Sequence, residues 1–374
     1  MALKREVKLF MLSERKKKIL QAVIDENIKS AEPISSKDLQ EKYFDSVSSA
    51  TIRNELMGLE ELGYLSHTHT SSGRVPTKTG FKKYIEELMP EKQLTRAEIE
   101  KLQENFNEKI DGIEDLVATT ARSISEATTL ASVVYMGVTA EASIEGVKLV
   151  KITDDSCLAI IVTDLGVIRD IVIEIPPNVS DEDCVTAGKI LSESMSGRTI
   201  KDLQDEESVA IGVSQSVDNY RMFFDLLIKA LKEREEKPIV RYGGASNLLS
   251  QPEYKSIEKA QRAMTIFENK EILAPLLESG NDLEISISVG TNENEDCSIV
   301  SATYKINGKS IGKAGVIGPV RMDYAKAVSV LREINQTIEN NVEFVGLKPK
   351  NKKAFKNQRY LNSTNKHTFG KKGE

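Results

Sequence analysis

Two planar side chains that can each form a pair of hydrogen bonds stand next to one another at Arg53 and Asn54. A guanidinium group can pair in this way with guanine, and a carboxamide with adenine. Hydroxyl-bearing residues precede them, and Ala50 could contact a thymine methyl group. The predicted contacts with a DNA groove or its edges are Ser48, Ser49, Thr51, Arg53 and Asn54.

Residues 47–65 have the period of an amphipathic helix that would present these groups. The core-facing side is apolar, with Ile52, Leu56, Leu59 and Leu62 in one arc. Ser48 is a suitable N-cap, and Gly63 stands where a helix C-terminus favours a left-handed residue. Glu60 and Glu61 fall in the last turn, away from phosphates if the N-terminus enters the major groove. An ordinary solvated surface helix has a similar pattern, so the neighbouring elements decide between the two.

Those neighbours favour a winged helix. Two shorter helices are predicted before it, over 13–27 and from Ser35 or Ser36 to Tyr43, with Pro33 between them. After Gly63 a strand, a polar turn and a second strand at 74–76 predict a hairpin, and a helix over 81–89 closes the domain. Side chains suited to phosphate or minor-groove contact occupy this hairpin: His67, Thr68, His69, Thr70, Ser72 and Arg74.

Other chemistry is poorly supported. A phosphate loop would need glycine five positions before Gly308, and that position is Thr303, so residues 307–315 are interpreted as a glycine-rich turn beside a strand. His67 and His69 share one face of a strand, but the third histidine is His367 in the tail, which argues against zinc and against a hydrolytic triad. We therefore expect no cofactor, no metal site and no catalysis.

Charge is strongly segregated along the 374 residues, whose formal net charge is −6. Residues 1–89 carry 15 basic and 13 acidic side chains, and residues 348–374 carry nine basic side chains and one acidic. The intervening 90–347 hold 27 basic and 43 acidic side chains. This balance is expected when one end binds nucleic acid and an acidic body does something else.

Length and composition predict two or three globular domains in the cytoplasm. The longest stretch without a charged residue, Ala127–Ala140, is shorter than the roughly 18 residues of a membrane helix, and no signal-peptide pattern opens the chain. Cys157, Cys184 and Cys297 are scattered and odd in number, as expected of reduced, mostly buried thiols. No membrane association is expected.

The rest of the chain predicts an α+β body. A long helix over 95–131 is followed by strands at 147–152, 158–163 and 167–175, and then by helices at 181–195, 219–232 and 254–268. Strands return at 283–289 and 298–306, and a last helix spans 321–337. Strands interrupted by a helical segment suggest one α+β domain with an insertion, and the Lys- and Asn-rich residues 348–374 are predicted to be a disordered basic tail.

Three blocks carry a resemblance to a known family. ATIRNELMGLEELGYLSHTHTSSGRVPTKTGFKKYIEELM at 50–89, YGGASNLLSQPEY at 242–254 and AGVIGPVRMDYAKAVSVL at 314–331 resemble HrcA, the bacterial heat-inducible transcription repressors. The resemblance implies an α+β multidomain protein: a winged helix-turn-helix at 1–90, a GAF-like domain at 91–205 and 283–347, an inserted helical dimerising domain at 206–282, and the tail. It also implies a bacterial, cytoplasmic homodimer that binds an inverted repeat in double-stranded DNA upstream of chaperone operons. The resemblance further implies repression that is relieved on heat stress, with activity modulated by the GroEL chaperonin.

Three alternatives stay open at this point. The first is a one-component repressor whose GAF-like domain senses a small molecule. The second is an enzyme with an accessory DNA-binding head, and the third is RNA binding through the basic tail.

Overall fold

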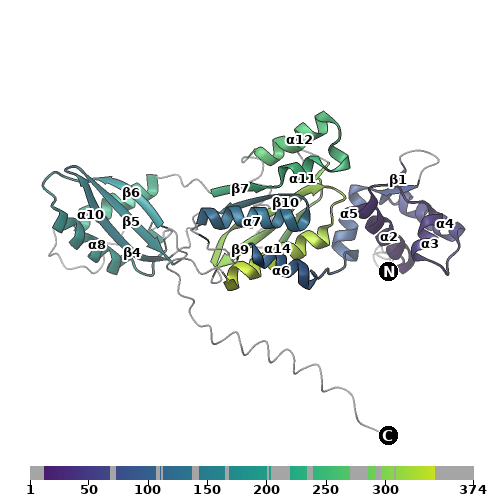
Figure 1. Cartoon of the computed structure of the whole chain (residues 1–374), viewed down its shortest axis with the longest axis horizontal. Coiled ribbons are helices and arrows are strands. Elements are labelled where there is room, and N and C mark those ends of the chain that lie inside the picture. Colours follow the sequence, from purple (N-terminus) through teal and green to yellow (C-terminus); the bar gives the residue numbers. More distant parts are fainter. Residues whose placement is uncertain are drawn as a thin grey trace, which may run out of the picture. The chain divides into compact units, whose positions relative to one another are not determined.

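Two units make up the chain (Figure 1). The first comprises Met1–Lys109, Glu114–Thr139 and Glu236–Asn340, and the second comprises Ile110–Ile113, Ala140–Glu235 and Asn341–Glu374. The computed structural model describes residues 12–67, 73–106, 110, 113–136, 143–164, 168–199, 202–203, 220–233, 239–269, 285–290, 296–306 and 309–341. Among these residues, no helix has both the length and the apolar character needed to cross a bilayer.

Three helices and a hairpin form the start of the first unit, residues 12–89, which we call the head. The helices are α2 (Glu14–Ser30), α3 (Ser36–Tyr43) and α4 (Ser49–Glu61), and each begins after a serine whose hydroxyl accepts a backbone N–H. Strands β1 (Leu65–His67) and β2 (Arg74–Pro76) pair antiparallel, and α5 (Lys78–Lys83) continues into a π-helical turn at Tyr84–Leu88. This element order is the one that the sequence predicts.

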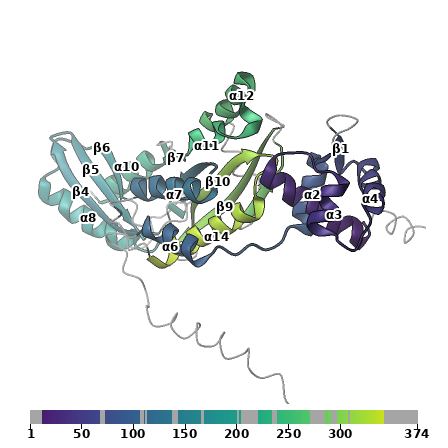
Figure 2. The same ribbon diagram turned by 45° about the vertical axis from the view of Figure 1, so that its right-hand side comes forward.

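A five-stranded antiparallel sheet forms the rest of the first unit, which we call the central domain (Figure 2). The strand order is β7 (Ile239–Gly243), β3 (Ala131–Met136), β10 (Lys309–Pro319), β9 (Cys297–Ile306) and β8 (Ile285–Ser288). Helices α6 (Arg96–Glu104), α7 (Ile113–Thr128) and α14 (Tyr324–Asn341) cover one face. The helices α11 (Ala245–Leu249), η2 (Pro252–Tyr254) and α12 (Ile257–Glu268) cover the other.

The alternation of side chains along β9 shows how the two faces are filled. Cys297 and Ile299 are buried with Phe267 on the α12 side. Ser298 points the other way and accepts a hydrogen bond of 2.9 Å from the hydroxyl of Tyr324 at the start of α14. Both faces of the sheet are therefore buried, so its strands lack the polar-apolar alternation of a half-exposed sheet.

The interpretation of residues 307–315 as a glycine-rich turn is wrong for the part that the structure describes. Residues 309–319 are the middle strand of the sheet, paired with β3 on one side and β9 on the other. A Cβ atom at Gly312 would lie 2.2 Å from the carbonyl oxygen of Tyr135, so glycine permits a close approach of two backbones there. The predicted turn at 307–308 lies outside the described residues.

The single helix predicted over 95–131 is also wrong. The segment forms α6, which ends at Glu104, then α7, which ends at Thr128, and then β3. Thr129 has a φ of 56°, a left-handed conformation that ends α7 and turns the chain into the strand. The weak helix former Gly112 separates the two helical patterns, although both have apolar residues at a helical period.

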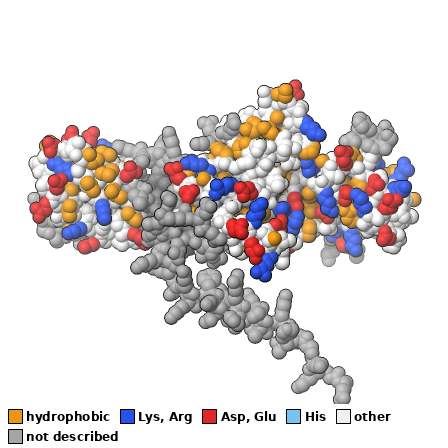
Figure 3. All heavy atoms as spheres, in the orientation of Figure 1, with side chains coloured by type: hydrophobic (Ala, Val, Ile, Leu, Met, Phe, Trp, Pro, Cys, Tyr) orange, Lys and Arg blue, Asp and Glu red, His pale blue; other side chains and the backbone are white. Residues whose placement is uncertain are grey.

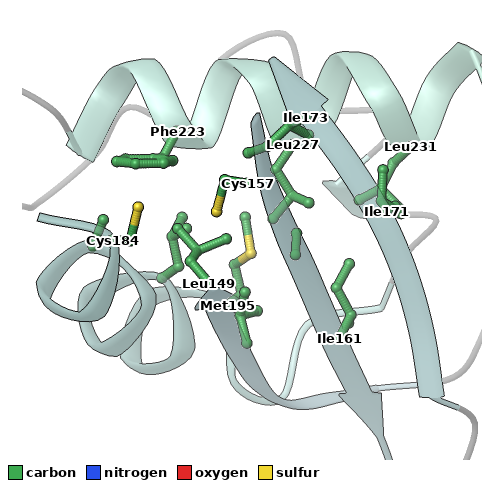
Figure 4. Close-up of a cluster of buried hydrophobic side chains, with 14 of the residues drawn as sticks. Leu149, Cys157, Ile161, Ile171, Ile173, Cys184, Met195, Phe223, Leu227 and Leu231 are labelled. Carbon is green, nitrogen blue, oxygen red and sulfur yellow. The ribbon is translucent and has the colours of Figure 1, made fainter. Parts of the chain in front are cut away.

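The second unit is a three-stranded meander covered by two helices. Strands β4 (Ile144–Thr153), β5 (Ser156–Thr163) and β6 (Ile168–Glu174) pair in sequence order, and α8 (Asp181–Met195) and α10 (Tyr220–Glu233) pack on one face. Figure 4 shows Phe223, Leu227 and Leu231, at helical spacing along α10, meeting the inward-facing side chains of the strands. Cys157 and Cys184 lie in this core, and all three cysteines are free and buried, as predicted.

The domain boundaries differ from those expected from the sequence. Residues 140–205, expected in the GAF-like domain, belong largely to the second unit, because β4–β6 pair only with one another. Residues 239–269, expected in the inserted helical domain, belong to the central domain, because β7 pairs with β3. The second unit is thus a sheet with helices, where the sequence predicts a helical insertion. The cause is that strand pairing between distant segments leaves no periodic signal in either one.

Candidate nucleic-acid interface

The start of α4 presents a polar surface held by a local cap. Ser48 Oγ accepts the backbone N–H of Thr51 at 3.2 Å and lies 2.8 Å from Thr51 Oγ1. These two hydroxyls therefore shape the helix terminus as well as facing solvent. Arg53 and Asn54 are exposed and Ser49 is half-buried, so the predicted base-reading groups are accessible one turn into the helix.

A methionine also lies on this surface. Met57 is 46% exposed and follows Ala50, Arg53 and Asn54 at helical spacing on the same face. An exposed apolar side chain beside two hydrogen-bonding groups can contact thymine methyl groups. The opposite face buries Ile52, and α4 is anchored there in the core of the head.

Basic residues at the start of α2 reach α4 through one carboxylate. Lys16 Nζ lies 2.6 Å from Glu55 Oε2, and Arg15 Nη1 lies 3.9 Å from Glu55 Oε1. A Cβ atom at position 58 would lie 2.9 Å from Lys16 Nζ, so Gly58 leaves room for the lysine side chain to pass over α4. Lys16 therefore ties the two helices together, and the neighbouring Lys18 is an exposed cation of the same cluster.

The hairpin is held to α4 by a single acidic residue. Glu60 Oε2 accepts a hydrogen bond of 3.0 Å from Arg74 Nε, and Glu60 Oε1 contacts His67 Nδ1. The Arg74 side chain is only 16% exposed, so it fixes the base of the hairpin more directly than it can reach a phosphate. Thr68, His69, Thr70 and Ser72 lie outside the described residues.

An isolated β-bridge to the segment between α2 and α3 supports the hairpin. Ile34 pairs with Arg74, because its N–H donates to the Arg74 carbonyl at 3.0 Å and its carbonyl accepts the Arg74 N–H at 2.8 Å. At the other edge of α4, Gly63 has a φ of 78° and turns the chain from the helix into β1. The hairpin is thus fixed to the head at Gly63, where β1 follows α4, and at Arg74, the first residue of β2. The sequence indicates only a break at Pro33 and does not indicate the pairing of the next residue, Ile34.

Helix α3 is secured against α2 by charged hydrogen bonds. Glu26 accepts from Lys42 Nζ at 2.5 Å and from the Tyr43 hydroxyl at 2.7 Å. These bonds, chiefly the one from Lys42, hold the pKa of Glu26 below its ordinary value. The angle between the two helices that precede α4 is therefore set by side-chain geometry that the sequence does not reveal.

The structure brings together Ser48, Ser49, Thr51, Arg53 and Asn54 on the first turns of α4, and it places His67 and Arg74 on the adjacent hairpin around Glu60. The roles of Lys16, Glu55, Met57 and Glu60 were not predicted. Glu60 precedes Arg74 by 14 residues, and no local pattern indicates that the two side chains meet in the folded chain. Within the described residues, no group of three His, Cys, Asp or Glu side chains could hold a metal ion.

Comparisons with known proteins agree with the resemblance in the sequence. Residues 114–328 match the family described as HrcA protein C terminal domain. The chain is 35% identical over 332 residues to the heat-inducible transcription repressor HrcA of Symbiobacterium thermophilum, covering 87% of this chain and 97% of that protein. It is 34% identical over 334 residues to the repressor of the same name from Halalkalibacterium halodurans, covering 88% and 97%.

A solved structure has a similar fold. A crystal structure described as that of a hypothetical protein aligns with a TM-score of 0.51 at 21% identity, and covers 88% of this chain and 99% of that one. The mixed α/β fold is therefore one that an experimental structure also has.

Proposed function

Because this chain belongs to the HrcA family of heat-inducible transcription repressors, which are negative regulators of transcription and not enzymes, we propose that it represses heat-shock operons by binding an inverted-repeat operator as a homodimer. The head acts as a winged helix, and α4 enters the major groove by its N-terminus. The observation that carries this proposal is the exposure of Arg53 and Asn54 on that end of α4, while the apolar face is buried.

The contacts divide by distance from the helix terminus. Arg53 and Asn54 read base edges, and Ser49 and the Ser48–Thr51 cap lie at the groove edge. Residues 68–72, which join β1 to β2 in sequence, contact the flanking DNA backbone in this proposal, and the Arg74–Glu60 pair fixes the strands on either side of them. Base reading and backbone contact thus come from adjacent elements of the head.

Dimerisation is supported by exposed apolar side chains on one sheet face of the second unit. Val150, Leu158 and Val172 form one row across β4, β5 and β6, and all three point away from the core on α8 and α10. Val150 is 49% exposed, Val172 is 61% exposed, and the nearby Ile152 is 54% exposed. Figure 3 shows these strands as a gathering of hydrophobic side chains. An apolar patch of this kind marks an interaction surface, and a second copy of the chain covers it in our proposal.

Modulation by the GroEL chaperonin is supported by the topology of the central domain. Strand β3 pairs with β10, although about 180 residues separate Val133 from Gly315 in sequence. Such long-range pairing folds slowly and leaves apolar surface exposed meanwhile. A chain of this kind depends on a chaperonin to reach its active form, and loses that help when heat-damaged proteins occupy it.

The alternative is a repressor that responds to a small molecule bound by the central domain. Two buried hydroxyls, those of Tyr304 and Thr337, have no protein hydrogen-bond partner among the described residues. They lie on β9 and α14, which are packed together, since Asn335 Oδ1 of α14 accepts the N–H of Lys305. An operator affinity that shifts with a metabolite and is indifferent to the chaperonin would favour this alternative.

The deciding experiment is footprinting with the purified full chain on the promoter regions of chaperone operons from the organism that encodes it. Protection of an inverted repeat, with two halves about one or two helical turns apart, is expected of a symmetric dimer. Protection of no site, or of single unpaired half-sites at every protein concentration, would contradict the proposal.

A further inference from the structure

A partly buried arginine of the central domain forms a hydrogen bond to the head. Arg321 lies in the loop between β10 and α14, with a side chain that is 15% exposed. Its Nη1 donates to the carbonyl of Ile28 in α2 at 3.1 Å. Its Nε and Nη2 donate to the two carboxylate oxygens of Glu253, the second at 3.2 Å, and Nη2 also donates to Gln251 Oε1 at 3.2 Å.

The acceptor on α2 is a carbonyl that the helix itself cannot satisfy. Ile28 is among the last residues of α2, whose carbonyls have no N–H one turn ahead. Ala31 caps the helix by donating to Asn27, one residue earlier, at 2.9 Å. A cation placed at this end is also favoured by the helix dipole. Arg321 therefore completes the C-terminus of α2 from another domain.

Glu253 fixes the orientation of the Arg321 guanidinium group. A carboxylate that pairs with a guanidinium through both oxygens fixes the plane of the arginine. The two partners come from segments far apart in sequence, residues 251–254 and 319–324, which belong to the two downstream blocks that are typical of the family. The contact is thus built from residues that have no other part in the candidate interface with DNA.

Helix α2 connects the Arg321 contact to α4, the proposed recognition helix. Its C-terminal end is held at Ile28, and its N-terminal end is tied to α4 by the Lys16–Glu55 ion pair of 2.6 Å. The two points are 12 residues apart, which corresponds to about 18 Å along a helix. A tilt of about 10° at one end would move the other by about 3 Å, close to the roughly 3.4 Å rise of one base pair.

Other contacts join the central domain to residues outside α2, and Asp25 of α2 interacts with the second of these pairs only through space. Phe81 and Tyr324 have ring centroids 6.2 Å apart, and Lys92 Nζ lies 2.6 Å from Asp323 Oδ2. Neither pair involves α2. Loss of the arginine should therefore loosen the direction of α2 and leave the head in place.

We propose that Arg321, held by Glu253, is a positioning residue for operator recognition: it fixes the direction of α2 and so the separation of the two α4 helices in the dimer. The number of base pairs between the half-sites then follows from this contact. The inference rests on the proposed function, because only a dimer on an inverted repeat has such a spacing.

The test compares duplexes that differ only in spacing. Wild-type full chain first selects its inverted repeat from a random-sequence duplex pool. Binding is then measured on that repeat and on versions with one or two base pairs added or removed between the halves. The variants are Arg321→Ala, Arg321→Lys, and Arg321→Ala with Glu253→Gln, which avoids leaving the partly buried Glu253 carboxylate unpaired. Arg332→Ala is the matched control, since Arg332 is an exposed arginine of α14.

Wild type and the control should lose about tenfold or more in affinity for each altered spacing, whereas Arg321→Ala and the double variant should lose less than about threefold. Arg321→Lys keeps the charge without the planar fork and should fall between them. If no repeat is selected, the proposed function fails. If a repeat is selected and both alanine variants, folded by circular dichroism, discriminate spacings as sharply as wild type, the positioning role is wrong.

Discussion

Arg53 is the side chain on which sequence discrimination depends most directly in our proposal. Replacing it by alanine should cost about 1–3 kcal/mol on the selected duplex and relax the preference at one base position. The measurement is a set of binding isotherms on duplexes that carry each of the four bases at every operator position. Equal loss on operator and on scrambled DNA would show that Arg53 contributes charge alone.

Lys18→Ala is the informative control for Arg53→Ala. Lys18 is exposed at the start of α2, whereas the neighbouring Lys16 is tied to Glu55 and Lys17 to Glu14. Its loss should weaken binding to all sequences alike, and the slope of log affinity against log salt should fall by about 0.9 for one phosphate contact.

Arg74 has a different expected role, because its guanidinium is bound by Glu60. Arg74→Ala should raise the exchange rate of the backbone amides in residues 64–67 and 73–77 by roughly 5- to 30-fold, equivalent to about 1–2 kcal/mol of local stability. Hydrogen exchange with mass spectrometry measures this directly. Arg96→Ala is the comparison, because Arg96 is 92% exposed in its pair with Glu100 and should change local exchange by less than about threefold. Unchanged exchange in the hairpin would mean that Arg74 does not anchor it.

For single residues, the sequence predicted well whether a side chain is buried, exposed or a helix cap. It predicted poorly which other side chain each one contacts. The cap at Ser48, the buried Ile52 and the exposure of Arg53 and Asn54 followed from helical period and capping preference, which are local. The pairing of Arg74 with Glu60 did not, because it depends on where a hairpin folds back onto a helix. Local rules predict which face a side chain occupies, and tertiary structure decides what it meets there.

Asp25 lies where α2 meets the π-helical turn Tyr84–Leu88, and its carboxyl group makes the stability of the fold depend on pH. Asp25 Oδ1 accepts a hydrogen bond of 2.9 Å from the Tyr84 hydroxyl, but burial, followed by repulsion from Asp323, raises the pKa of Asp25 above its ordinary value of 3.8. A carboxyl group whose pKa is raised in the folded state binds more protons there than in the unfolded chain. Its contribution to stability is therefore greatest below pH 3.8 and is lost as the pH rises through the folded value.

Asp25→Asn should remove this dependence and keep the hydrogen bond from Tyr84, because the amide oxygen can still accept it. The difference in unfolding free energy, wild type minus variant, should become more favourable to wild type as the pH falls from 7 towards 4. Urea unfolding of both proteins at a series of pH values, followed by a probe in the head, measures this difference. A difference that is constant with pH, or that changes in the opposite direction, would contradict the assignment.

Elements with a clear local period were predicted well. Helix α8 spans Asp181–Met195 as expected, α4 begins after the predicted cap Ser48, and β5 begins two residues before its predicted start and ends where predicted. The missed strands were β3, which is buried on both faces, β10, which is rich in glycine, and β7, a five-residue edge strand that is partly buried throughout, so none of them has a period of two. Their partners lie far away in sequence, which explains why the domain boundaries were displaced as well.

The exposed sheet face of the second unit gives the prediction for the whole molecule. Val172→Lys puts a charge at one end of the Val150–Leu158–Val172 row, at its most exposed position, and should weaken the dimer by about 30-fold or more, because a buried unpaired ammonium costs at least about 2 kcal/mol. Sedimentation equilibrium of the full chain measures the dissociation constant. Val185→Lys is the matched control, since Val185 is 53% exposed on α8. Equal effects from the two substitutions would argue against this face as the dimer interface.

The route of the chain through β3 and β7 has a topological consequence. Met136, the last residue of β3, is the register partner of Ile239, the first residue of β7. Their Cα atoms are thus roughly 4.5–5.5 Å apart, a gap that a two-residue reverse turn can close. From the viewpoint of the five-stranded sheet, residues 137–238 occupy the place of an ordinary hairpin loop. An ancestor could have gained or shed this whole segment by a single in-frame event without disturbing any rung of the ladder.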